Sequence, residues 1–214
     1  MKKTMIAVPC MDQVPAQFAQ SLAMLEKAGP TTVAFQVGSL IYTSRNNLAG
    51  LAINQEADYI FWLDSDMMFP AGTLRHMLKT IEEQEDDVIL SGVYYRRVAP
   101  FSPVVFSELD LSGKTAKWKN MDDIPRDGLF ECEGFGFGCV LAPTAAFMDV
   151  QAKFGDMFTP INGTGEDLSF CWRARQAGWK LMCDPRIELG HVAHHVVTRE
   201  AWEDFREYTQ EEKK

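Results

Sequence analysis

The sequence contains no run of apolar residues that approaches the ~20 needed to cross a membrane. After Met1 there is only a short apolar run, which ends at Pro9. A signal peptide needs a longer apolar region and a cleavage site of small residues. We therefore expect a cytoplasmic protein with no integral membrane segment.

Cysteine is scarce, and none of its five copies forms a Cys-x-x-Cys pair. An odd number of scattered cysteines indicates neither a disulfide framework nor a cysteine zinc site, and it fits a reducing compartment. These residues are Cys10, Cys132, Cys139, Cys171 and Cys183.

Positive charge is also scarce: 21 Lys and Arg residues stand against 30 Asp and Glu residues, which gives a net charge of −9. This balance argues against a nucleic-acid backbone or an anionic membrane surface as the main partner. It does not exclude a nucleotide, because a metal ion and one or two local cations can neutralise the phosphates.

The 214 residues suffice for one full-sized domain, and no repeat, low-complexity segment or linker divides them. Strand and helix patterns alternate in the first half, which predicts an α/β fold with an open, mostly parallel sheet. We expect strands at residues 5–8, 31–37, 59–63 and 88–90. We expect three helices between them, which bury Phe18, Leu22 and Leu25, then Leu48, Leu51 and Ala52 after an N-cap at Thr43 or Ser44, and then Leu74, Met77, Leu78 and Ile81.

The second half is less regular. A terminal helix after Thr198 would carry Trp202 and Phe205 on one stripe, which could serve a contact in a homo-oligomer as readily as the protein's own core. The other expected elements are strands at 104–106, 116–118 and 180–183, a glycine-aromatic run at 134–141 that merges into a strand, a helix opened by Pro143 and Thr144, and a helix at 165–177.

Asp64-Ser65-Asp66 directly follows the apolar run 59–63, which is typical of a parallel strand buried on both faces. Ligands of open α/β sheets bind beyond the carboxyl ends of the strands. Two carboxylates there concentrate negative charge that a hard divalent cation would relieve, and such a cation also bridges nucleotide phosphates. The alternative is a pair of turn or helix-capping aspartates before Pro70.

Glu166 and Asp167 open the expected helix 165–177. The helix dipole favours acidic residues in a first turn, so capping is one interpretation. The other is a carboxylate presented at a cleft as the general base that deprotonates a sugar or another hydroxyl.

Three of the four histidines, His191, His194 and His195, follow the strand-like residues 187–189. Neutral imidazole is a good metal ligand, but the spacing lacks the Glu or Cys that accompanies known zinc motifs.

The order of these motifs resembles that of glycosyltransferases with the GT-A fold, especially those of family 2. The resemblance extends from Ile6 to about His191. It is carried by Ser44-Arg45-Asn46 before a helix, by the Asp-x-Asp run at 57–67 and by the Glu-Asp helix followed by Gly178-Trp179-Lys180.

This resemblance implies one GT-A-like catalytic domain at residues 1–198, followed by a charged helix or tail at 199–214. The domain would have a nucleotide-sugar half at about 1–92 and an acceptor half at about 93–198. The implied reaction moves a hexose-like sugar from a nucleotide-diphosphate sugar, with a UDP-sugar as the expected donor. The acceptor would be an unidentified hydroxyl of a small molecule, a glycan or a protein.

The resemblance also implies a set of metal and donor ligands. Mn²⁺ or Mg²⁺ would be bound directly by Asp66 and completed by His191, with Asp64 on the ribose or in the water shell of the metal. Arg45 and Pro9 would lie near the donor nucleotide.

Asp167, with Glu166 beside it, is similar to the catalytic base of inverting members of the family. Gly136, Phe137 and Gly138 sit where the family places a loop that lines the sugar and acceptor pocket. Glycines there allow close approach of the backbone, and the aromatic rings of this run could stack on a sugar face. The alternative is a strained turn whose rings fill the core.

The irregular stretch 94–130 could act as a lid that excludes water. The sequence departs from the family at residues 35–39, which end the second strand without a carboxylate to hold the nucleotide base. This departure supports an alternative, a non-catalytic nucleotide- or carbohydrate-binding module of the same fold. Phosphatases of the haloacid dehalogenase type also carry Asp-x-Asp after a strand, but there it follows the first strand and continues with Thr or Val, whereas Met67 follows here.

Overall fold

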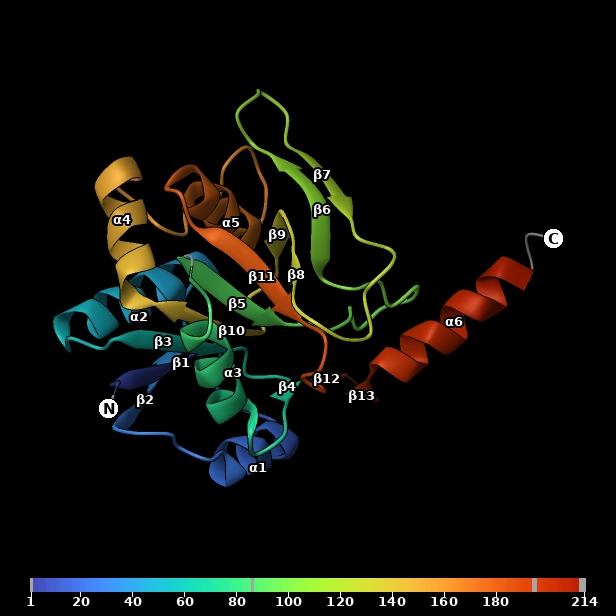
Figure 1. Cartoon of the computed structure of the whole chain (residues 1–214), viewed down its shortest axis with the longest axis horizontal. Coiled ribbons are helices and arrows are strands. Elements are labelled where there is room, and N and C mark those ends of the chain that lie inside the picture. The colour runs from blue at the N-terminus through green and yellow to red at the C-terminus, as the bar shows by residue number, and fades with distance from the viewer. Residues whose placement is uncertain (1, 86, 194–195, 212–214) are drawn as a thin grey trace.

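The computed structural model describes residues 2–85, 87–193 and 196–211. Its centre is a seven-stranded sheet, in which five strands run in one direction and the other two run against them (Figure 1). The predicted α/β fold with an open, mostly parallel sheet is therefore confirmed. In spatial order the strands are β2 (Thr31–Val37), β1 (Thr4–Cys10), β3 (Tyr59–Leu63), the reversed β10 (Cys139–Pro143), β5 (Val88–Gly92), β11 (Lys180–Asp184) and the reversed β8 (Phe130–Glu131).

Strand β1 continues two residues beyond its predicted end and contains Pro9. The Gly38 N–H donates to the Cys10 carbonyl at 3.1 Å, so Cys10 directs its backbone toward β2. Because neighbouring residues of a strand face opposite sides, the backbone of Pro9 faces β3, where pairing has already ended at Ala7. The missing N–H of Pro9 therefore costs no ladder hydrogen bond.

Helices cover both faces of the sheet (Figure 1). On one face the core contains Leu48, Phe147 and Phe170, and on the other it contains Phe18 and Leu74. The first face is covered by α2 (Ile41–Asn54), α4 (Thr144–Phe154) and α5 (Glu166–Gln176), and the second by α1 (Ala16–Met24) and α3 (Thr73–Glu82).

Helix α2 begins at Ile41, before the predicted N-cap at Thr43 or Ser44. Ser44 lies inside the helix, buried, and its hydroxyl is 2.8 Å from that of Ser39. Leu51 was expected to be buried but is 38% exposed, because the inward face of α2 is already occupied by residues one turn apart. The buried residues of α2 are Ser44, Arg45, Leu48, Ala49 and Ala52.

Two small sheets complete the fold. The strand-like pattern at residues 187–189 predicted a strand before His191, but the strand begins at Gly190, and Ile187 and Leu189 instead fill the core. The first small sheet contains β13 (Val196–Val197), β12 (Gly190–Val192) and β4 (Met67–Met68), and the second contains β7 (Lys117–Asn120), β6 (Val105–Asp110) and β9 (Gly134–Phe135).

The terminal helix α6 (Arg199–Glu211) leads away from the body of the molecule (Figure 1). Trp202 is buried and stacks on Tyr95 with ring centroids 5.1 Å apart, so it serves the protein's own core. The side chain of Phe205 lies outside the described part of the structure. Among the described helices, none combines the length and the apolar character that crossing a bilayer requires.

Candidate active site

A cavity of about 260 Å³ opens at the carboxyl ends of β1 and β3. Segments far apart in the sequence meet around it: the end of β1, helix α2, the turn after β3 and the start of α5. The predicted site residues that line it are Pro9, Arg45, Asp64, Asp66, Glu166 and Asp167.

Asp64 and Asp66 lie in the turn that joins β3 to β4. The Asp64 N–H donates to the Gly138 carbonyl and the Met67 N–H donates to the Asp64 carbonyl, each at 3.1 Å. The turn leaves the two carboxylates 29% and 25% exposed. Neither caps α3, whose N-cap residue is Gly72, so the helix-capping alternative is wrong.

Arg45 joins the two halves of the site. Its Nη2 donates to Asp64 Oδ1 at 2.8 Å, and its Nε donates to Glu166 Oε1 at 3.1 Å. The side chain is only 2% exposed, and its guanidinium carbon lies 5.2 Å from the ring centroid of Phe137. Burial works to lower the pKa of Arg45, but Asp64 and Glu166 raise it above its ordinary value.

The environments of the two aspartates differ. Burial raises the pKa of Asp64, with a further contribution from Asp66, although Arg45 opposes the shift. Burial also acts to raise the pKa of Asp66, but His191 and Arg97 outweigh it, and the pKa is lowered. Asp66 is therefore the more readily ionised of the pair.

Asp66 and His191 meet although they are far apart in the sequence. Pairing of β12 with β4 places His191 opposite Met67, and His191 Nε2 lies 3.4 Å from Asp66 Oδ2. His191 Nδ1 is 2.8 Å from the Tyr95 carbonyl, which can only accept, so Nδ1 carries the hydrogen. The backbone carbonyl thus orients the ring so that Nε2 faces Asp66, an arrangement typical of metal-binding histidines.

The expected metal ligands are only partly brought together. Asp66 and His191 form a pair, whereas Asp64 is engaged by Arg45. Within the described residues, no group of three or more His, Cys, Asp or Glu side chains is arranged to hold a metal ion. His194 and His195 lie outside the described residues.

Glu166 and Asp167 occupy the first turn of α5, after Gly165 as N-cap residue. Asp167 Oδ1 accepts the Leu168 N–H at 2.7 Å, so this carboxylate does contact the helix start as the capping interpretation requires. Burial, with a contribution from Glu166, raises the pKa of Asp167 to about 6. A carboxylate in this range can accept a proton near neutral pH, so capping and a role as base are compatible.

The loop Gly136 to Gly138, which was expected to line the acceptor pocket, packs into the core instead. Phe137 is 1% exposed and makes edge contacts with Trp62 and Phe158, so its ring belongs to the core and cannot stack on a sugar. A Cβ on Gly136 would lie 2.7 Å from Val104 Cγ1, and one on Gly138 would lie 2.8 Å from Tyr94 Cζ. The glycines therefore admit Tyr94 and Val104, and the core-filling alternative is the one found.

The end of β2 has no carboxylate near the cavity. Met11, Ser39 and Ile41 form this part of the wall. Ser39 is held by Ser44, as described above. This part of the wall is thus uncharged, in agreement with the lack of a carboxylate at residues 35–39.

Arg97 is a site residue that the sequence analysis missed. Its Nη1 lies 2.9 Å from Asp66 Oδ2, and its side chain is 51% exposed. The one signal in the sequence is its place shortly after β5, because the carboxyl ends of β3 and β5 share one edge of the sheet. Arg97 also shows that the start of the irregular stretch 94–130 borders the site.

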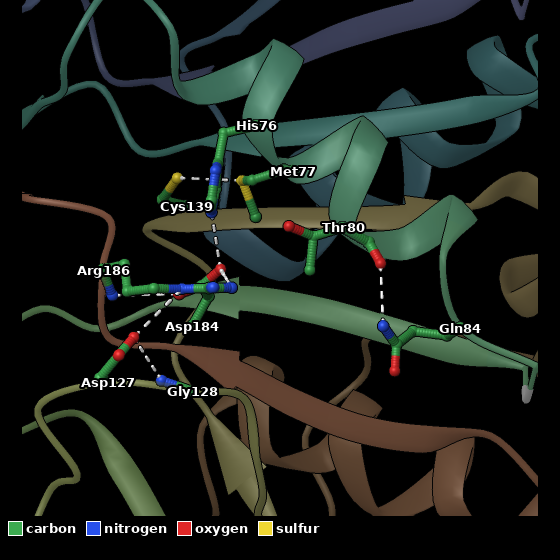
Figure 2. Close-up of polar contacts among 9 residues, drawn as sticks. All are labelled: His76, Met77, Thr80, Gln84, Asp127, Gly128, Cys139, Asp184 and Arg186. Atoms are coloured by element: carbon green, nitrogen blue, oxygen red, sulfur yellow. Dashed lines mark hydrogen bonds and ion pairs between the residues drawn. The ribbon is translucent and has the colours of Figure 1, made fainter.

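The buried carboxylate of Asp184, at the same edge of the central sheet, has a structural role (Figure 2). Asp184 ends β11 with a fully buried side chain, which accepts from His76 Nε2 at 2.7 Å and from Arg186 Nε and Nη2 at 2.8 Å. Burial works to raise the pKa of Asp184, but Arg186 and His76 lower it below its ordinary value. Because its oxygens are satisfied within the protein, Asp184 holds the end of the strand.

Comparison with known proteins supports the fold and the family resemblance. The model of the family "Glycosyl transferase family 2" matches residues 35–134, which include Arg45, Asp64 and Asp66. A solved structure described as A197 from STIV superposes with a TM-score of 0.65 and 13% identity, and the match covers 92% of this chain and 94% of that chain. No curated protein matches the sequence.

The predicted resemblance is confirmed: the chain is a GT-A fold protein that resembles family 2 glycosyltransferases. The family match supports glycosyl transfer in general terms. Asp167 and His191 lie beyond the matched residues, so their roles depend on the geometry described above.

Proposed function

We propose that the protein is a metal-dependent glycosyltransferase that moves a sugar from a nucleotide-diphosphate sugar, with UDP as the expected nucleotide, to a hydroxyl acceptor. The observation that carries the proposal is the single cavity around which Arg45, the Asp64–Asp66 turn and the Glu166–Asp167 helix start converge. The family match supports the donor class.

Asp66 and His191 are the two proposed protein ligands of a divalent ion such as Mn²⁺ or Mg²⁺. Asp66 would bind it through its readily ionised carboxylate, and His191 through Nε2, which the Tyr95 carbonyl already orients. When bound, the ion would neutralise charge on the departing diphosphate as a Lewis acid. Asp64 is fixed by Arg45 and would contact the ribose or the water shell of the ion.

Asp167 is the proposed general base. Arg45 binds the neighbouring Glu166, which leaves Asp167 as the carboxylate of this helix start without a cationic hydrogen-bond partner among the described contacts. Its raised pKa allows it to take the proton of the acceptor hydroxyl, which contributes about 10²–10⁴-fold in rate for such catalysts. The first residues of the 94–130 stretch, including Arg97, would act as a lid.

The test is a panel of nucleotide-sugars incubated with Mn²⁺ and the protein, with release of the nucleoside diphosphate as the measurement. We expect metal-dependent release from one donor class, and loss of release in Asp167→Asn with donor binding retained. Retained turnover in that variant would remove Asp167 from the role of base.

A second candidate is a non-catalytic binding module of the same fold. The uncharged wall at Met11, Ser39 and Ile41 favours it, because the usual carboxylate contact to the base is absent there. Such a module would be stabilised against heat by Mn²⁺ and a nucleoside diphosphate without any donor hydrolysis.

A further inference from the structure

Strand β2 forms one outer edge of the central sheet, and no other described strand pairs with its far side (Figure 1). At the two ends of β2, the Pro30 carbonyl accepts the Thr4 N–H at 2.9 Å, and the Gly38 N–H donates to the Cys10 carbonyl at 3.1 Å. The even-numbered residues of β2 therefore direct their backbone N–H and C=O groups toward β1. Because residues alternate along a strand, Val33, Phe35 and Val37 direct theirs away from the sheet.

The same three residues also carry exposed apolar side chains. Val33 is 39% exposed, Phe35 46% and Val37 53%. They alternate along the strand, so they lie on one face of the sheet. The edge thus combines free backbone donors and acceptors with an apolar row beside them.

This edge lacks the features with which proteins protect exposed strands, such as brevity, charge, proline and bulges. Strand β2 has seven residues, none of them charged and none of them proline, and it pairs with β1 without a shift in register. The opposite edge of the same sheet is β8, which has only two residues and ends in Glu131. Of the two edges of the central sheet in the described part of the chain, β2 is the one suited to pairing with another strand.

Charge favours a second copy of this chain as the partner. Residues 28–44 contain no charged side chain, in a protein of which 24% of the residues are charged. With a net charge of −9, two copies repel each other over most of their surfaces, but not at this edge. A partner recognised by opposite charge would find no group to bind here.

We propose that the protein forms a two-fold dimer in which β2 pairs antiparallel with β2 of a second copy. If the two-fold axis passes beside Phe35, Phe35 lies opposite Phe35 of the second copy, and Val33 lies opposite Val37 of the second copy. All three residues direct their backbone outward, so each pair can exchange N–H···O bonds. Two seven-stranded sheets then become one of fourteen strands, and the apolar rows meet on one face.

The first test is sedimentation velocity of the full chain over a dilution series. We expect a species of about 48 kDa, twice the 24.2 kDa of one chain. Phe35→Lys places two like charges opposite each other and should weaken dimerisation by about 30-fold or more. Met148→Lys, at a 52% exposed apolar residue of α4, is the matched control and should leave the dimer intact.

A second test concerns the backbone and the register. Val33→Pro removes an outward N–H without breaking the β1 ladder, so it should yield a monomer whose melting temperature matches that of other monomeric variants. Phe35→Cys should form an intermolecular disulfide under mild oxidation, because opposite Cα atoms of such a pair lie about 5.5 Å apart. Val33→Cys should not form this disulfide, because Val33 lies opposite Val37 of the second copy and not opposite its own counterpart.

A monomeric wild-type protein at every concentration would overturn the proposal. So would a dimer that survives both Phe35→Lys and Val33→Pro, or equal cross-linking of the two cysteine variants. Circular dichroism of each variant separates loss of pairing from loss of folding. A variant that fails to fold is replaced by Val37→Lys, for which the same outcomes apply.

Discussion

Arg45 Nη2 lies 2.8 Å from Asp64 Oδ1, so the first aspartate of the pair is held by a buried guanidinium from α2. The second, Asp66, instead faces His191 and Arg97. Asp64 is thus paired with a buried cation of α2, whereas Asp66 is paired with a half-exposed arginine and a histidine. This difference explains why Asp66, rather than Asp64, is the proposed direct metal ligand.

Loss of the Arg45 side chain should destabilise the protein. Arg45→Met leaves Asp64 and Glu166 without their shared cation, and removal of one partner from a buried ion pair costs about 3–5 kcal/mol. Urea unfolding measures the change in the free energy of unfolding. Arg75→Met is the control, because Arg75 pairs with Glu26 at an exposed site and such pairs contribute about 0–1 kcal/mol. Equal effects of the two variants would contradict the structural role of Arg45.

His191→Ala should weaken Mn²⁺ binding by about 10-fold or more, as loss of groups at metal sites commonly does. His76→Ala is a matched control, because His76 also contacts an aspartate, at the structural cluster of Asp184. Titration of Mn²⁺ by calorimetry measures both. A metal affinity unchanged in His191→Ala, or reduced equally in His76→Ala, would remove His191 from the metal site.

Activity should depend on the ionisation of Asp167. Because its pKa is raised to about 6, kcat/KM should fall as the pH drops through about 6, where the base becomes protonated. A pH–rate profile of the wild-type protein measures this limb. A profile that is flat from pH 5 to about pH 8 would contradict the assignment.

The same carboxyl group should affect stability in the opposite direction. Its pKa in the folded state lies above the ordinary 3.8, so folding favours the protonated form. The stabilisation is complete below about pH 4 and is lost as the pH rises through about 6. Asp167→Asn should therefore melt at a higher temperature than the wild type above pH 6, and this difference should disappear at pH 4. A melting temperature lowered at neutral pH would show that ionised Asp167 stabilises the fold.

Gly136→Ala should lower the free energy of unfolding by about 1–3 kcal/mol, because the added methyl group would clash with Tyr94 and Val104. Gly50→Ala in α2 meets no atom within 4 Å and should instead stabilise the helix by about 0.5–1 kcal/mol. Thermal and urea unfolding compare the two. If Gly136→Ala keeps its stability but loses acceptor binding, the glycine lines a pocket after all.

The main strands could be predicted because local sequence defines them. The bounds of β2 and β3 match the predicted 31–37 and 59–63, since each is an apolar or β-branched run. The strand that holds His191 could not be predicted. It has three residues and is defined by its pairing with β4 and β13, which no local pattern reveals.

The site was predictable to a similar extent. Asp64 and Asp66 could be chosen as candidates because they follow a buried strand, and Asp167 because it opens a helix, and all three line the cavity. Phe137 was placed in a pocket because a glycine-aromatic run has the same pattern in a pocket wall and in a core. Only its contacts with Trp62 and Phe158 distinguish the two.

The most direct test of the account is the anomalous scattering of Mn²⁺ in crystals grown with Mn²⁺ and UDP. We predict one strong Mn²⁺ peak in contact with Asp66 and His191, with the diphosphate of UDP on the same ion and the uridine in the cavity beside Pro9. A peak elsewhere, or UDP bound in this cavity with no metal at Asp66, would contradict it.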